Sequence, residues 1–202
     1  MPGLFLATNN PGKLAELSAL LGDLPVDLHT PTELGKPFEV AEDGATYLEN
    51  ARAKASVGVR ASGMPTLGED TGLEVPSLGG APGLRSRRFA GETATGAELC
   101  RALLDALGPL KSSRPPAHFR CVAVLLLPDG RRFEGEGILE GVIAAEPRGD
   151  RGFGYDPIFV LPDGRHLAEL SLEDKNLLSH RARALAALEV RGAFDALISA
   201  PS

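Results

Sequence analysis

Two extended segments joined by a short turn constrain the fold more than any other feature of the sequence. Residues 119–127 are dominated by apolar and aromatic side chains and form the strongest strand candidate in the chain. Pro128, Asp129 and Gly130 are typical turn residues, and extended sequence resumes at residues 133–144. This pattern predicts an antiparallel hairpin in the middle of the fold.

Strand and helix patterns alternate on both sides of this hairpin. Residues 4–7 form a short apolar run, after which leucines recur at helical spacing as far as Gly22, and residues 46–60 and 97–107 also have helical patterns. Further extended pieces are predicted at residues 26–28, 66–67, 73–75 and 158–161, a polar turn at 68–72, and helical sequence from near Leu172 to Leu188. We therefore expect one α/β domain over residues 1–202, with a mixed β-sheet and flanking helices. A second lobe around the hairpin is the alternative.

The charge and cysteine content exclude several classes of protein. The net charge of −6 argues against a protein that coats DNA or RNA, whereas a small anionic ligand needs only a local group of cations. Cys100 and Cys121 lack metal-ligand spacing, so we expect reduced thiols in the core.

The first residues do not resemble a signal peptide, and no apolar run is long enough to cross a membrane. A cytoplasmic location is the expectation.

A polar loop between the first predicted strand and helix is a candidate anion site. It comprises Thr8, Asn9, Asn10, Pro11, Gly12 and Lys13. Backbone amides at a helix N-terminus attract anions, and Lys13 adds a full positive charge. The loop is not a Walker A motif, because Ala7 replaces the first glycine and Leu14 replaces the metal-binding hydroxyl residue. A capped loop without a ligand remains the alternative.

Two acidic pairs stand in segments that look like turns. These pairs are Glu42 with Asp43 and Glu69 with Asp70. Carboxylate oxygens suit Mg²⁺, although adjacent acids are also common on solvated surfaces. The glycines around the second pair would let a ligand approach the backbone, which makes that pair the more suggestive one.

An aromatic segment and a downstream basic segment could recognise a base. Phe153 and Tyr155 alternate with glycines, and Asp156 could accept hydrogen bonds. Lys175 and residues 179–181 are expected on or near one helix, within about a turn of one another. A packed loop and an exposed charged helix face are the alternatives.

In combination these motifs resemble the inosine triphosphatase family, also called the non-canonical purine NTP pyrophosphatase or Ham1-like family. The matching motifs cover nearly the whole chain: residues 8–13, 42–54 with Glu49, Asn50 and Ala51, residues 69–73, 79–83 and 153–156, Lys175, and residues 179–181. The resemblance implies an elongated, two-lobed subunit with a central nucleotide cleft, usually a homodimer. It also implies hydrolysis of ITP, dITP and XTP to the monophosphate and pyrophosphate, which removes these nucleotides before their incorporation into DNA or RNA.

Residue-by-residue matching to the family implies specific roles. Glu42 and Asp70 would hold Mg²⁺, and Asp70 would also be the general base. Substrate contacts would come from Thr8 to Lys13 at the triphosphate, from Lys54 and Thr71, and from Phe153, Gly154, Tyr155, Asp156, Lys175, His180 and Arg181 at the base. Asn9 stands where several family members have Gly, which leaves the geometry of the first loop open, although Asn tolerates left-handed backbone better than most residues.

The resemblance also suggests how the base is selected and how the bond is cut. Phe153 would stack on the purine, and cationic donors near its six-position would favour an oxo group over the amino group of adenine. Lys13 and Mg²⁺ would neutralise phosphate charge while Asp70 activates water for attack at the α-phosphorus. Two other functions stay open: a pyrophosphatase for modified pyrimidine nucleotides, and a nucleotide-binding regulator without turnover.

Overall fold

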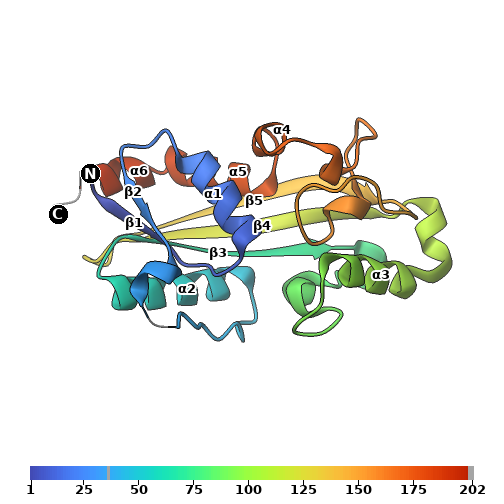
Figure 1. Cartoon of the computed structure of the whole chain (residues 1–202), viewed down its shortest axis with the longest axis horizontal. Coiled ribbons are helices and arrows are strands. Elements are labelled where there is room, and N and C mark those ends of the chain that lie inside the picture. The colour runs from blue at the N-terminus through green and yellow to red at the C-terminus, as the bar shows by residue number, and fades with distance from the viewer. Residues whose placement is uncertain (36, 200–202) are drawn as a thin grey trace. The chain divides into compact units, whose positions relative to one another are not determined.

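The computed structural model describes residues 1–35 and 37–199, and it alternates strands with helices (Figure 1). Lys36 and residues 200–202 lie outside the described residues. The strands are β1 (Gly3–Leu6), β2 (Asp27–His29), β3 (Thr66–Glu74), β4 (Pro116–Leu126), β5 (Arg132–Ile143) and β6 (Phe159–Val160). The α-helices are α1 (Pro11–Leu21), α2 (Tyr47–Ser62), α3 (Gly96–Leu107), α4 (Leu172–Asn176), α5 (His180–Val190) and α6 (Ala193–Ile198). The short 3₁₀ helices in the described residues are η1 (Pro31–Leu34), η2 (Pro76–Leu78), η3 (Gly83–Arg88), η4 (Gly108–Ser113), η5 (Asp156–Ile158) and η6 (Leu167–Glu169).

The six strands form one mixed sheet in the order β2-β1-β3-β4-β5-β6. Strand β1 pairs in parallel with both β2 and β3, whereas β5 and β6 are antiparallel. Strands β4 and β5 are neighbours joined by a short loop, in which the Leu127 amide donates to the Arg131 carbonyl at 2.9 Å. The predicted hairpin and the predicted mixed α/β sheet are therefore confirmed.

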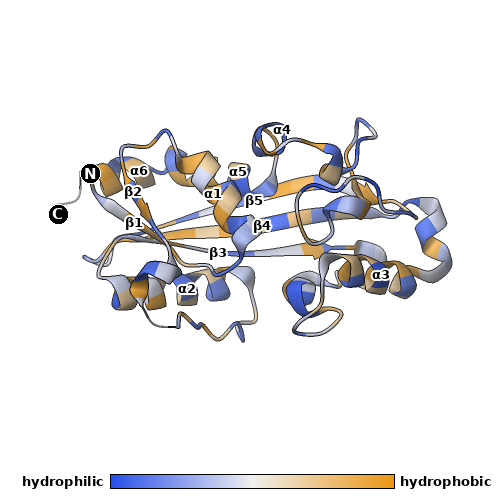
Figure 2. Cartoon of the chain, in the orientation of Figure 1, coloured by the Kyte–Doolittle hydropathy of each residue, from blue (hydrophilic) through white to orange (hydrophobic). Residues whose placement is uncertain are grey.

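The chain divides into two compact units, each with its own apolar core. Unit one contains residues 1–70, 121–137 and the chain from residue 180 onward, and unit two contains residues 71–120 and 138–179. The core of unit one draws on β1, β4, α1, α5 and α6, and that of unit two on β3, α3, β5 and the segment around β6. Figure 2 shows the apolar stretches of α1, α6 and β4 in orange. None of the helices in the described part of the chain has both the length and the apolar character that a membrane span requires.

In unit one, helices cover both faces of the sheet (Figure 1). Helix α2 packs closely on β3, because a Cβ atom on Gly58 would lie 2.4 Å from Thr66, and one on Gly68 would lie 2.5 Å from the backbone of Ala51 and Ala55. These two glycines remove the side chains that would otherwise separate helix and strand. Helices α1, α5 and α6 lie on the opposite face.

In unit two, α3 shows how local sequence directs packing. Thr95 caps the helix by accepting the Glu98 amide, and the Glu98 carboxylate accepts the Thr95 amide in return. Leu99, Leu103 and Leu107 then recur at helical spacing and are buried in the core of the unit. The predicted helix at residues 97–107 is therefore confirmed.

Three details of the structure differ from the sequence prediction. Residues 68–72 are not a turn, because β3 runs without interruption from Thr66 to Glu74. The helical sequence from Leu172 is two helices, since α4 ends at Asn176 and α5 begins at His180. A short final helix, α6, follows the left-handed Gly192. Cys100 and Cys121 are both buried and free of disulfides, as predicted.

Candidate functional site

The loop from Thr8 to Lys13 caps the first helix with its own side chain. Asn10 is the N-cap of α1, and its Oδ1 accepts hydrogen bonds from the amides of Gly12 at 2.9 Å and Lys13 at 3.2 Å. Pro11 has no amide hydrogen to offer. The amides of Gly12 and Lys13 are therefore occupied by the side chain of Asn10 in this structure, and the predicted anion site at this loop stays a prediction.

Asn9 holds the loop to a neighbouring segment. Its Nδ2 donates to the carbonyl oxygen of Phe38 at 2.6 Å, and its backbone is not among those with positive φ. The left-handed geometry that the sequence raised for Asn9 is therefore not needed in this loop.

The Lys13 ammonium lies 3.1 Å from Glu69 Oε1. The Lys13 side chain is 15% exposed, whereas that of Glu69 is 2% exposed, so a partly exposed cation pairs with a buried carboxylate. This contact joins the predicted phosphate loop to strand β3.

Glu69 in turn belongs to a buried charged network. Arg181 Nε donates to Glu69 Oε2 at 2.7 Å, and Arg181 Nη1 pairs with Glu16 of α1. Burial alone would raise the pKa of the Glu69 carboxyl, but the charges of Arg181 and Lys13 outweigh burial and hold that pKa well below its usual range. The pKa of Arg181 is likewise raised, because the charges of Glu69 and Glu16 outweigh its burial. Three elements, α1, β3 and α5, are thus tied together under Lys13.

Asp70 points to the other face of β3, because successive strand residues alternate. Asp70 is 5% exposed. Its hydrogen-bond partners come from helix α2, which packs against Gly68 on the same face of the strand. Asn50 Nδ2 donates to Asp70 Oδ2 at 2.9 Å, and Lys54 Nζ donates to Asp70 Oδ1 at 3.0 Å. The close packing of α2 on β3 therefore fixes the orientation of the Asp70 carboxylate.

Lys54 also brings Glu42 to the same place. Its ammonium lies 2.8 Å from Glu42 Oε1, and the Glu42 side chain is 39% exposed. Burial lowers the pKa of Lys54, but the carboxylates of Asp70 and Glu42 outweigh burial and leave this pKa raised. The two predicted metal ligands are thus gathered around one buried cation, with Glu42 open to solvent.

The oxygen donors of these two carboxylates are chemically suited to Mg²⁺. Mg²⁺ is usually held by one or two carboxylates together with substrate phosphates, rather than by a complete cage of protein ligands. Within the described residues, no group of three or more acidic, histidine or cysteine side chains could hold a metal ion. Glu42 and Asp70 therefore supply an incomplete oxygen donor set of the kind that phosphate oxygens would complete.

In unit two, the predicted base-recognition residues form a second cluster. Asp156 Oδ2 accepts from the Phe153 amide at 2.8 Å and from Lys175 Nζ at 2.5 Å, and the Lys175 ammonium lies 5.0 Å from the centre of the Phe153 ring. Gly152 is required here, because a Cβ atom would lie 2.0 Å from Asp156 Oδ2. The cluster places a cation against the face of a half-buried aromatic ring.

Tyr155 and Thr71 also lie in unit two. The hydroxyl of buried Tyr155 donates to the Ser86 carbonyl at 2.8 Å, and Ser86 Oγ accepts from the Leu73 amide at 2.8 Å. Tyr155 therefore links the aromatic segment to η3 and β3, and burial raises the pKa of its hydroxyl. Thr71 follows Asp70 directly on β3 and is partly exposed.

The basic residues predicted on one helix are divided between the units. Lys175 lies in α4 of unit two, whereas His180 and Arg181 begin α5 of unit one. All three side chains are buried, so the alternative of an exposed charged face is wrong. His180 is packed tightly, since a Cβ atom on Gly137 of β5 would lie 2.1 Å from the His180 carbonyl oxygen.

The sequence analysis gave no role to two residues that organise this site. Glu16 and Asn50 fix Arg181 and Asp70, respectively. Glu16 is three positions after Lys13, so helical spacing alone would have placed both on one side of α1. Asn50 is four positions before Lys54 and could have been found in the same way.

Comparison with known proteins identifies the family to which this chain and its fold belong. The model of the Ham1 family matches residues 4–190. A dITP/XTP pyrophosphatase of Geobacter sulfurreducens is 45% identical over 94% of this chain and 96% of its own length. Another, from Syntrophobacter fumaroxidans, is 44% identical over 96% of this chain and 83% of its own length. The structure of a HAM1 protein from Coxiella burnetii has a TM-score of 0.83 and 40% identity, and covers 99% of this chain and 100% of that one.

Fold and site thus define a mixed α/β protein in which Lys54 bridges the carboxylates of Glu42 and Asp70. The chain belongs to the Ham1 family.

Proposed function

We propose that this protein hydrolyses non-canonical purine nucleoside triphosphates, namely ITP, dITP and XTP, to the nucleoside monophosphate and pyrophosphate. The relatives named dITP/XTP pyrophosphatase support this activity and this substrate class. The structural observation that carries the proposal is the buried Asp70 carboxylate, held by Asn50 and Lys54 with Glu42 alongside. Such hydrolysis would remove these nucleotides from the pool before they enter DNA or RNA.

Unit one supplies the proposed phosphate chemistry. Lys13 is partly exposed and can offer its ammonium to phosphate oxygens, while Thr8 and Asn9 shape the loop before it. Asp70 would orient and deprotonate the water that attacks the α-phosphorus, and pyrophosphate would leave. Asn50 and Lys54 keep both oxygens of this carboxylate in fixed directions, which limits the positions that the water can take.

Glu42 and Asp70 are the residues that would hold Mg²⁺. When bound there, the ion supplies charge neutralisation at the phosphates. Lys54, between the two carboxylates, balances their charge in the structure, and a contact from Lys54 to a phosphate oxygen is part of the proposal.

Base recognition is proposed for Phe153 to Asp156, Lys175, His180 and Arg181. Phe153 offers a ring face for stacking on the purine, and Lys175 is held beside this face by Asp156. A donor such as the Lys175 ammonium would favour the six-oxo group of hypoxanthine or xanthine and would oppose the amino group of adenine. The guanidinium of Arg181 already binds two carboxylates, so we assign it a positioning role in addition to any contact with the base.

A substrate panel tests this function. Pyrophosphate release from ITP, XTP, dUTP, TTP and ATP would be measured with Mg²⁺ and with the metal chelated. We expect Mg²⁺-dependent release from ITP and XTP at much higher kcat/KM than from the other three. A preference for dUTP or TTP would replace this proposal with a pyrimidine nucleotide pyrophosphatase, and ITP binding without any product would replace it with a regulator.

We also propose that the chain forms a homodimer and acts in the cytoplasm. Light scattering on the purified full chain would test the first point, with twice the chain mass of 21.1 kDa expected.

A further inference from the structure

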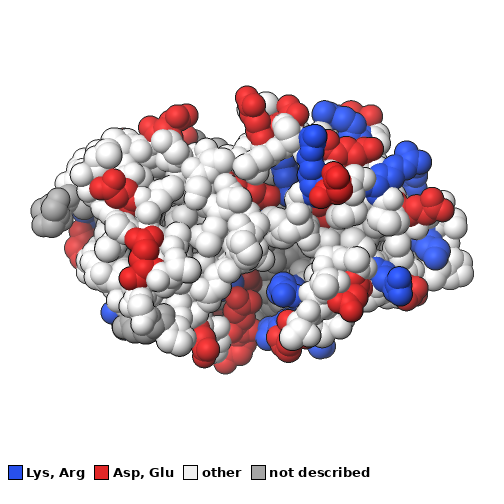
Figure 3. Space-filling model, viewed as in Figure 1, with Lys and Arg blue, Asp and Glu red and all other residues white. Residues whose placement is uncertain are grey.

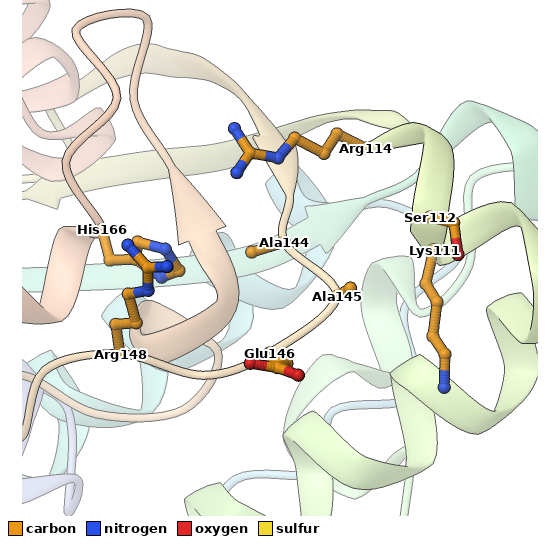
Figure 4. Close-up of a pocket in the computed structure, with 8 residues that line it drawn as sticks. All are labelled: Lys111, Ser112, Arg114, Ala144, Ala145, Glu146, Arg148 and His166. Carbon is orange, nitrogen blue, oxygen red and sulfur yellow. The ribbon is translucent and has the colours of Figure 1, made fainter.

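Unit two contains a cavity of about 150 Å³ that is separate from the cluster around Phe153 (Figure 4). Lys111 and Arg114, at the end of η4, line one side of it, and Glu146, Arg148 and His166 line the other. One water molecule needs roughly 10–15 Å³ of such space, whereas pockets for drug-sized ligands span about 300–1,000 Å³. The cavity therefore has room for a small polyatomic ligand but not for a complete nucleotide.

The lining carries an excess of positive charge. Lys111, Arg114 and Arg148 have no carboxylate partner among the described residues, and Glu146 is the single acidic residue of the lining. In Figure 4, the guanidinium of Arg114 extends towards Arg148 and His166, whereas Lys111 points the other way. In a chain with a net charge of −6, whose acidic and basic side chains on one face are shown in Figure 3, the three cations of the lining give this cavity a local positive charge.

The wall that carries Arg148 and His166 is held in place by one carbonyl group. The Pro157 oxygen accepts the Arg148 amide at 2.9 Å and His166 Nδ1 at 2.6 Å. A carbonyl can only accept, so Nδ1 carries the hydrogen. Gly149 packs against η6, since a Cβ atom there would lie 2.4 Å from the Ala168 carbonyl oxygen. The backbone beside the cavity is thus preorganised, which lowers the entropic cost of binding.

Arg114 occupies an unusual backbone conformation at the opposite wall. Its φ of 50° and ψ of 65° are left-handed, and it is followed by Pro115. Left-handed geometry carries a steric cost for residues with a Cβ atom, and glycine is the usual residue at such a helix end. An arginine at this position therefore carries a steric cost that glycine would avoid, and its side chain places a cation at the cavity.

We propose that this cavity binds a small phosphate-bearing anion, inorganic phosphate or pyrophosphate, with Arg114 and Arg148 as its charged donors. The planar guanidinium group can donate two parallel hydrogen bonds to such an anion. This proposal does not rest on the proposed function, because none of the residues that carry it belongs to the hydrolytic or base-recognition clusters.

Isothermal titration calorimetry on the full chain tests the proposal, with inorganic phosphate and pyrophosphate in separate titrations. Arg114→Gly removes a cation and suits the left-handed backbone, so this variant should fold with a thermal midpoint no lower than that of the wild type. Arg148→Gln keeps a polar side chain of similar length without the charge. We expect each variant to bind at least one of the two anions about tenfold more weakly than the wild type.

Two further variants separate this cavity from the phosphate loop of unit one. Lys13→Ala should bind the anion at the cavity as tightly as the wild type does. Glu146→Gln should bind this anion more tightly than the wild type, because the substitution removes a repulsive charge. The anion with the higher affinity in the Lys13→Ala background identifies the ligand. Wild-type affinity in both arginine variants, complete loss of binding in Lys13→Ala, or no binding of either anion to the wild type would overturn the proposal.

Discussion

Lys54 of α2 donates a hydrogen bond of 3.0 Å to Asp70 of β3, and this contact joins the two elements that build the proposed hydrolytic site. It exists because Gly68 lets α2 approach the strand at van der Waals distance. The same cation holds Glu42, so substitutions around it should affect chemistry more than folding.

Asp70→Asn should separate catalysis from binding. The amide keeps the size of the side chain but cannot accept a proton from water, so we expect kcat for ITP to fall by about 100-fold or more. Dissociation constants for ITP should stay within a few-fold. Asp129→Asn, at an exposed turn of the same unit, is the matched control and should leave kcat unchanged. Near-normal turnover in Asp70→Asn would remove this carboxylate from the mechanism.

Lys13→Ala should weaken both binding and turnover, because its ammonium is proposed to contact phosphate in the ground state and in the transition state. Loss of one charge-assisted contact predicts about tenfold weaker ITP binding together with a lower kcat. Arg60→Ala, at the exposed end of α2, removes a cation from the same unit and serves as the control. Unchanged binding in Lys13→Ala would contradict a phosphate role for this loop.

Arg181→Met should destabilise the protein strongly. Removing one partner from a buried charged network leaves Glu69 and Glu16 without their guanidinium, which costs about 3–5 kcal/mol of unfolding free energy. Arg165→Met breaks an exposed pair with Asp163 and should cost less than about 1 kcal/mol. Urea unfolding of both variants measures the difference, and equal effects would show that the buried network does not stabilise unit one.

Glu69 should make stability depend on acidity. Its pKa is lowered in the folded state, so its contribution to the unfolding free energy is complete above the ordinary carboxyl pKa of about 4.3 and is lost as the pH falls towards the folded value. Wild type and Glu69→Gln, compared by urea unfolding at a series of pH values, should differ most near neutrality and converge in acid. A constant difference between the two would mean that the Glu69 charge does not contribute.

Much of the fold could be predicted from local pattern. Periodicity and turn residues predict the hairpin, the first strand and helix, and the capped helices α2 and α3. Strand β3 was not predicted as one continuous strand, because two glycines and two adjacent acidic residues are typical of a turn. The segment is extended in the structure because α2 packs directly against Gly68. In addition, Lys54 pairs with buried Asp70, and Arg181 pairs with buried Glu69.

The candidate site was predicted in its residues more than in its contacts. The acidic pair at 69–70 was predicted as a candidate site. That the two side chains lie on opposite faces of the sheet could not be predicted, because the sequence did not show that the strand continues through them. Arg181 is 112 positions away from Glu69, so no local spacing could reveal that pair. The break between α4 and α5, which separates Lys175 from His180, was equally invisible to a continuous helical pattern. The assigned roles of these residues and the Mg²⁺ requirement stay predictions.

The most direct test of the proposed reaction is hydrolysis of ITP in water enriched with oxygen-18, followed by mass spectrometry of the products. Attack of water at the α-phosphorus predicts IMP that carries one heavy oxygen, together with unlabelled pyrophosphate, and no reaction when Mg²⁺ is chelated. Heavy oxygen in the pyrophosphate, release of inorganic phosphate instead of pyrophosphate, or no IMP at all would contradict the account.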